Sequence, residues 1–286
     1  DAISMPSVSI AFSVEEDDEP FSYTMTLTDY TMETVSWGKF PVITPDPAAP
    51  VSRFAPLADW MITQSYQKMS VGSVAAETVF DDDTQSLNYG PITGGPVVNG
   101  RLAEFSYGPF TANQTIDTPA GPQNMTMSYG DITGRGIDLL PMVQLLTGNG
   151  GLTAAAPIMA EATLASLKLE SPELTVSMGP TQIKDFTIDP TRGAPLMRQL
   201  DQFVAMGLKG EEPDPGTVMK LILDMYGAYG FGLYSFSDIA FTAPGSSGKL
   251  GSFAVEGIDA NGMKRFAITD GTVTTPDGSG ALAPLK

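Results

Sequence analysis

The chain of 286 residues contains no histidine and no cysteine. Without an imidazole or a thiolate, it cannot form a Ser-His-Asp triad or a cysteine nucleophile. The usual nitrogen and sulfur ligands of zinc, copper, haem and iron–sulfur clusters are missing as well. Catalysis that depends on His or Cys is therefore excluded by composition, and we expect neither a metal centre nor a cofactor.

Basic residues are also scarce: 15 Lys and Arg stand against 33 Asp and Glu, which gives a net charge of −18. A field of this sign repels phosphate groups, so we expect no nucleic-acid partner. The only adjacent basic pair is Lys264-Arg265, and a polybasic membrane patch is absent. No apolar run reaches the roughly 18 residues that a membrane helix needs, so we expect no transmembrane segment.

The composition also bears on location and on the size of the core. An acidic, cysteine-free chain rich in Thr, Ser, Gly and Pro is typical of exported proteins. We therefore expect a periplasmic or extracellular location, with a signal peptide already removed. Apolar residues make up 42% of the chain, which is sufficient for a hydrophobic core.

Four segments carry apolar residues at the three- and four-residue spacing of an amphipathic helix. They are residues 53–69, 137–146, 194–208 and 217–229. The second is entered through Gly134-Arg-Gly136, which lacks the third glycine and the βαβ unit of a dinucleotide site, so we interpret it as a turn into the helix.

Most other segments alternate apolar and polar residues, as β-strands do. Meanders are predicted over residues 163–188 and 233–273, with Asn261-Gly262 as a hairpin turn. In residues 21–37 the apolar parity switches after Leu27, which a bulge or hairpin at Thr28-Asp29 would explain.

These patterns predict an α+β fold, in which antiparallel meanders are covered by about four amphipathic helices packed on the sheet. The flexible Gly148–Gly151 stretch divides the chain into residues 1–150 and 151–286, or the two halves form one continuous domain.

Acidic side chains are the remaining candidates for catalysis. A carboxylate-dependent hydrolase needs a pair of them, and those within or beside strands are the first to consider. These are Glu77, Glu104, Asp131, Asp185 and Glu256. The Asp81-Asp82-Asp83 triplet fits either a calcium site or a solvated strand end, and three Ser-x-x-Lys matches lack the companion motifs of a serine enzyme.

Methionine is abundant, with 15 residues, and many lie on the predicted apolar helix faces. Because Met side chains adapt to irregular shapes, these faces could enclose a cavity against the sheet, although ordinary core packing explains them too. The predicted lining is Met61, Ile62, Met142, Phe203, Met225 and Tyr226. We therefore expect an exported non-catalytic protein that binds a lipid or other hydrophobic ligand. A structural protein of the cell envelope with a protein partner, and a secreted carboxylate-dependent hydrolase, are the alternatives.

Overall fold

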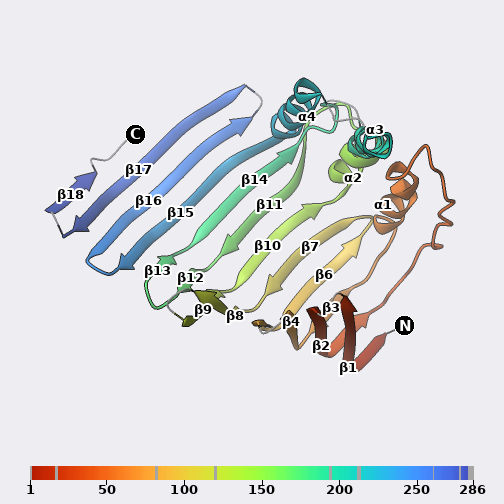
Figure 1. Cartoon of the computed structure of the whole chain (residues 1–286). Coiled ribbons are helices and arrows are strands. Elements are labelled where there is room, and N and C mark those ends of the chain that lie inside the picture. The colour runs from red at the N-terminus through yellow and green to blue at the C-terminus, as the bar shows by residue number, and fades with distance from the viewer. Residues whose placement is uncertain are drawn as a thin grey trace.

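The computed structural model describes residues 2–16, 19–80, 83–118, 121–192, 195–210, 214–259, 261–276 and 278–282. It is mostly antiparallel β-structure, with 59% strand and 18% helix, and the strands of the described residues belong to one sheet (Figure 1). The strands are β1 (Ile3–Glu16), β2 (Glu19–Glu33), β3 (Lys68–Val71), β4 (Ser73–Phe80), β5 (Asp83–Tyr89), β6 (Ile92–Val98), β7 (Arg101–Tyr107), β8 (Phe110–Thr118), β9 (Gly121–Tyr129), β10 (Ile132–Asp138), β11 (Ala156–Leu164), β12 (Leu167–Glu170), β13 (Thr175–Met178), β14 (Thr181–Ile188), β15 (Tyr229–Ala243), β16 (Ser246–Asp259), β17 (Gly262–Thr275) and β18 (Gly278–Leu282).

Many of these strands are the two halves of one longer strand. The pairs β3/β4, β5/β6, β7/β8, β9/β10, β11/β12 and β13/β14 are each separated by only one or two residues. Both halves pair with the same neighbouring long strand: β5 pairs with β8, for example, and β6 pairs with β7. The sheet is therefore a simple meander from β1 to β18, and every long strand within it is interrupted near its middle.

The hydrogen bonds where β5/β6 and β7/β8 are interrupted side by side show how the backbone continues through the interruption. Gly90 donates to the carbonyl of Pro109 and Gly108 donates to that of Pro91, both at 2.7 Å. In a regular antiparallel ladder, successive residues direct their N–H and C=O groups alternately to the two neighbouring strands. Gly90 and Pro91 both bond to the same neighbouring strand, so the backbone turns over at this step. The two residues of the step, Gly90 and Pro91, then face one side of the sheet. The side chains of Tyr89 and Ile92, three residues apart, share the other side.

The same step recurs across the sheet, and we call its course the kink line. Elsewhere it is marked by residues with positive φ, among them Asp29 at 50°, Asp238 at 53° and Asp270 at 53°. The predicted parity switch after Leu27 is confirmed, but the bulge or hairpin predicted at Thr28-Asp29 is not, because β2 keeps the same register with β1 on both sides of Asp29. Because the parity of each strand switches at the kink line, the apolar side chains above and below it point to the same face.

The helices gather at one end of the sheet (Figure 1). They are the 3₁₀ turn η1 (Ser52–Phe54), α1 (Ala55–Met61), α2 (Leu140–Thr147), α3 (Leu196–Leu208) and α4 (Pro215–Ala228). They occupy the connections β2–β3, β10–β11 and β14–β15, and turns in a meander alternate between its two ends, so these three connections lie at the same end.

The prediction of an α+β fold with helices packed on the sheet is therefore wrong, because most of the sheet has no helix layer over it. The first predicted helix is also too long: α1 ends at Met61, and Met69 lies in β3. Gly134 and Gly136 lie inside β10, not at a helix entrance.

A small core closes this end of the sheet. Leu145 of α2, Ile158 of β11, Ile188 of β14 and Ala228 of α4 form a buried cluster. Pro at the first turn of α2 and Gly148 in left-handed conformation at its end fix that helix over β11 and β14. The sheet itself continues across residue 150 through the pairing of β10 with β11, and the division into two halves stays a prediction.

Candidate functional site

One face of the sheet is apolar on both sides of the kink line, and we call it the apolar face. Two rows border the kink line, one below it and one above it. The row below contains Val8, Leu27, Val74, Tyr89, Phe110, Tyr129, Leu167, Met178, Ile239, Leu250 and Gly271. The row above contains Met5, Tyr30, Val71, Ile92, Tyr107, Ile132, Leu164, Thr181, Phe236, Phe253 and Ile268.

A further row lies outside each of these, in unbroken register from β1 to β17. The lower one contains Ile10, Met25, Ala76, Leu87, Ala112, Met127, Leu169, Val176, Phe241, Gly248 and Val273. The upper one contains Ile3, Met32, Met69, Gly94, Phe105, Gly134, Ala162, Ile183, Tyr234, Val255 and Phe266. None of these four rows contains a charged residue.

Residues close to the kink line differ in exposure between the two faces. Val71 and Ala112, close to the kink line, are only 5% exposed although no helix covers them. On the opposite face, the kink-line residues Pro91, Pro109 and Asp238 are exposed. This difference fits a sheet that bends toward its apolar face, where neighbouring rows of side chains meet on the inner side.

The surface area of the whole molecule fits an open sheet. The accessible surface is 16929 Å², whereas a compact protein of this mass is expected to expose about 11,700 Å². An excess of this size is expected of a single open sheet, because an ordinary sandwich covers one face of each sheet with a second layer.

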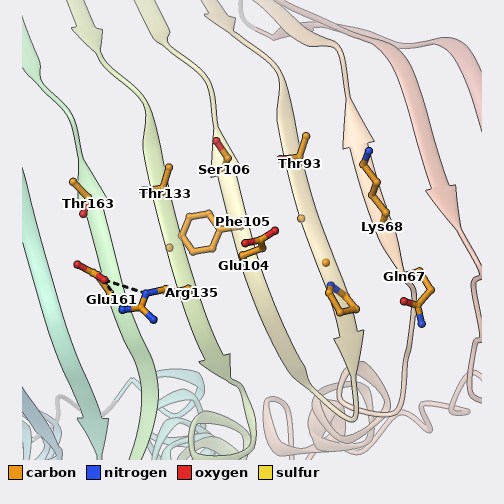
Figure 2. Close-up of a pocket in the computed structure, with 14 residues that line it drawn as sticks. Gln67, Lys68, Thr93, Glu104, Phe105, Ser106, Thr133, Arg135, Glu161 and Thr163 are labelled. Atoms are coloured by element: carbon orange, nitrogen blue, oxygen red, sulfur yellow. Dashed lines mark hydrogen bonds and ion pairs between the residues drawn. The ribbon is translucent and has the colours of Figure 1, made fainter.

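The opposite face is polar, and it holds a groove of about 690 Å³ between the kink line and the helical end. Figure 2 shows four hydroxyl side chains in a row across its strands, Thr93, Ser106, Thr133 and Thr163, together with the ion pair of Arg135 and Glu161. Gly94 and Gly134 also line this groove.

Glu161 is the most strongly held charge of the groove. Its Oε2 accepts from Nε and Nη2 of Arg135 at 3.0 and 2.9 Å, and its Oε1 accepts from Nε2 of Gln182 at 2.7 Å. Lys184 Nζ lies 3.6 Å from the same carboxylate. The hydrogen bond from Arg135 is the largest influence on the pKa of Glu161 and lowers it. Desolvation, the next largest, raises the pKa, whereas attraction to Lys184 and Arg135 lowers it again, so the net shift is downward. This site holds a carboxylate ionised, whereas a glycosidase also needs one carboxyl that stays protonated.

The other acidic candidates are dispersed. Glu104 lines the polar groove, Glu77 lies on β4, and Glu256 accepts from Arg265 at 2.9 Å. Asp131 lies on the kink line, and Asp185 of β14 adopts a φ of 50°. Asp81 and Asp82 lie outside the described residues. No group of three or more acidic side chains within the described part of the chain could hold a metal ion.

The six residues predicted to line a cavity all lie at the helical end. Met61 of α1 is 56% exposed, and Ile62 caps that helix. Met142 of α2 packs against the buried core cluster. Phe203 of α3 and Met225 of α4 are half-buried, whereas Tyr226 of α4 is 77% exposed. Helix α2 contacts α1 and α3, and α4 joins the same end of the sheet through Ala228, which belongs to the same buried cluster as Leu145 of α2.

Sequence reasoning missed the apolar face because it treated each parity switch as an isolated event. The signal is a pair of bulky apolar residues three apart with two small or turn-forming residues between them. It appears in Tyr89-Gly-Pro-Ile92, Tyr107-Gly-Pro-Phe110 and Tyr129-Gly-Asp-Ile132. Considered together, these steps would have placed the apolar side chains of both halves of each strand on one face of the sheet.

Comparison of the chain with protein-family models, with curated proteins and with solved structures finds no match. Within the described residues, no helix has the length and apolar character needed to cross a membrane.

Proposed function

We propose that the protein binds lipid-like amphiphiles along the apolar face and works as an exported, non-catalytic lipid-binding protein. The observation that carries the proposal is the continuous, uncharged and uncovered apolar face that runs from β1 to β17. Soluble proteins rarely expose a contiguous apolar surface larger than a few hundred Å² unless it binds something.

The shape and chemistry of the face favour acyl chains as the occupant. Met25 and Met32 of β2 belong to the outermost of the four rows and are seven residues apart, roughly 23 Å along a strand. The hydrocarbon region of one membrane leaflet is about 15 Å thick, so an acyl chain fits along one strand. Met25, Met32, Met69, Met127 and Met178 supply flexible side chains that adapt to chains of different shape.

The test is the amount of lipid that copurifies with matched variants. Tyr89→Glu combined with Met127→Glu places two charges on the apolar face. Asn88→Glu combined with Ser128→Glu places the same charges one residue away, on the polar face. We expect the first variant to lose most of its extractable lipid, by about tenfold, because each charge must be desolvated by a bound acyl chain. The second variant should retain the lipid of the wild type.

Native mass spectrometry and solvent extraction of purified protein give this readout, and circular dichroism establishes that both variants fold. Wild-type protein without bound lipid, even after incubation with phospholipid, would contradict the proposal. Equal lipid content in the two folded variants would remove the apolar face as the binding surface.

A further inference from the structure

On the two longest helices, part of the apolar stripe faces outward and stays exposed. In α3, Leu196 packs against the core cluster, whereas Leu200, Val204 and Leu208, spaced four apart, are 43%, 38% and 79% exposed. In α4, Met219, Leu223 and Tyr226 are 56%, 61% and 77% exposed. A surface helix of a soluble protein normally presents polar residues on that side.

An aromatic cluster lies at the same end of the molecule. Trp37 is 52% exposed and stacks with Trp60 of α1 at 6.3 Å between ring centroids, and the 61% exposed Phe40 meets Trp60 edge-on at 5.0 Å. The indole N–H of Trp60 donates to the carbonyl of Gly38 at 2.8 Å, which fixes the cluster.

The aromatic cluster is tied to α3. The carboxylate of Asp201 in α3 accepts from the backbone N–H groups of Val51 and Ser52 at 2.6 and 3.0 Å, next to α1. Exposed apolar groups from the loop after β2, from α3 and from α4 therefore gather at the helical end (Figure 1).

The helical end is also almost neutral. The described residues of segments 34–62 and 192–228 include six basic and five acidic side chains, in a chain whose net charge is −18. The negative charge is carried by the rest of the molecule. Two copies of the chain would repel each other because both are strongly acidic. An uncharged membrane surface would meet no such repulsion at the helical end.

We propose that the helical end docks on the surface of a lipid bilayer, with the outer stripes of α3 and α4 at the boundary between headgroups and acyl chains. Helices of 13 and 14 residues are too short to span a bilayer but suit an interfacial position. Trp and Tyr side chains are enriched at that depth. This proposal goes beyond lipid binding by the apolar face and does not require it.

The experiment measures flotation of the full chain with phosphatidylcholine vesicles. Both tryptophans of the chain lie in the aromatic cluster, so their fluorescence reports directly on this end. We expect the wild type to float with the vesicles and its emission to shift to shorter wavelength. Adding phosphatidylglycerol should weaken binding at low ionic strength, and salt should restore it, because the chain is strongly acidic.

Leu223→Asp and Leu208→Asp introduce a charge at exposed positions of the two stripes, and each should lower the partition coefficient about tenfold. Leu174→Asp is the matched control, since Leu174 is exposed in the β12–β13 turn at the opposite end, and it should float like the wild type. The Tyr89→Glu, Met127→Glu variant should also float, which separates this proposal from lipid binding by the apolar face.

Three results would overturn membrane docking. The first is wild-type protein that does not bind phosphatidylcholine vesicles. The second is flotation of both Leu208→Asp and Leu223→Asp at the wild-type level. The third is a dimer, seen by sedimentation without vesicles, that Leu223→Asp dissociates, because the stripes would then be a protein interface.

Discussion

Glu161 concentrates the charge interactions of the polar groove, and its lowered pKa makes a pH-dependent prediction. Because its folded-state pKa lies below the ordinary value of 4.5, the stabilisation is present above that value and is lost as the pH falls through the folded-state pKa. We expect Glu161→Gln to be less stable than the wild type at pH 7, with a difference that shrinks under acid conditions.

Urea unfolding at several pH values measures this difference. Arg135→Gln removes the largest cause of the lowered pKa and should weaken the same acid-dependent loss. A stability difference between Glu161→Gln and the wild type that does not change with pH would show that the ion pair is not its cause.

Gly134 is a residue where the apolar face leaves no room for a side chain. A Cβ there would lie 2.2 Å from Cε1 of Phe105, whose ring covers the glycine from the neighbouring strand. Gly134→Ala is therefore expected to cost about 1–3 kcal/mol of unfolding free energy by overpacking. Adding Phe105→Leu should recover part of that loss.

Gly280→Ala is the control for Gly134→Ala, because nothing lies within 4 Å of a Cβ at Gly280, and its unfolding free energy should change by less than about 0.5 kcal/mol. Equal destabilisation by the two alanines would mean that the intrinsic strand preference of glycine, not the contact with Phe105, sets the cost.

At the scale of elements, the kink line depends on backbone conformations that few residues tolerate. Asp238 of β15 has a φ of 53°, a region that Asp and Gly adopt more readily than β-branched residues do. We expect Asp238→Val to lose about 1–2 kcal/mol in thermal or urea unfolding, and Asp238→Gly to stay close to the wild type. If Val and Gly were equally tolerated, the strand would pass this step without the left-handed residue.

The sequence specified the elements better than their arrangement. The positions of α3 and α4, the last three long strands and the parity switch at Asp29 all follow from local periodicity, because each pattern extends over enough residues. Two features did not follow. The helices looked like a covering layer because an apolar stripe does not say what it packs against, and much of the apolar stripe of α3 and α4 stays exposed. The first helix was predicted too long because Tyr66 and Met69 continue the helical spacing, although both residues pair with strands of the sheet.

The candidate site was predicted only in its chemistry. Methionine-rich apolar surface was expected on helices, whereas Met25, Met32, Met69 and Met127 lie on the sheet. The strand alternation that would have located them is broken by the two-residue steps, so no single window of sequence contains the whole pattern. The register between strands, which only the folded chain supplies, aligns the steps into one kink line.

The whole molecule is an open sheet with one polar and one apolar face and a nearly neutral helical end. A net charge of −18 opposes association between copies of such a molecule. An ordinary sandwich would cover this face with a second sheet. Here we propose that lipid does so, and that the helical end meets the membrane from which the lipid comes.

The most direct test of the central claim uses the absence of cysteine in the chain. Leu87→Cys on the apolar face and Asn88→Cys on the polar face can each be labelled at a single site with an environment-sensitive fluorophore. After removal of bound lipid, a zwitterionic lysophospholipid is titrated into each protein. We predict a saturable shift to shorter emission wavelength at position 87 and no shift at position 88. No shift at either position, or the same shift at both, would contradict a lipid-binding apolar face.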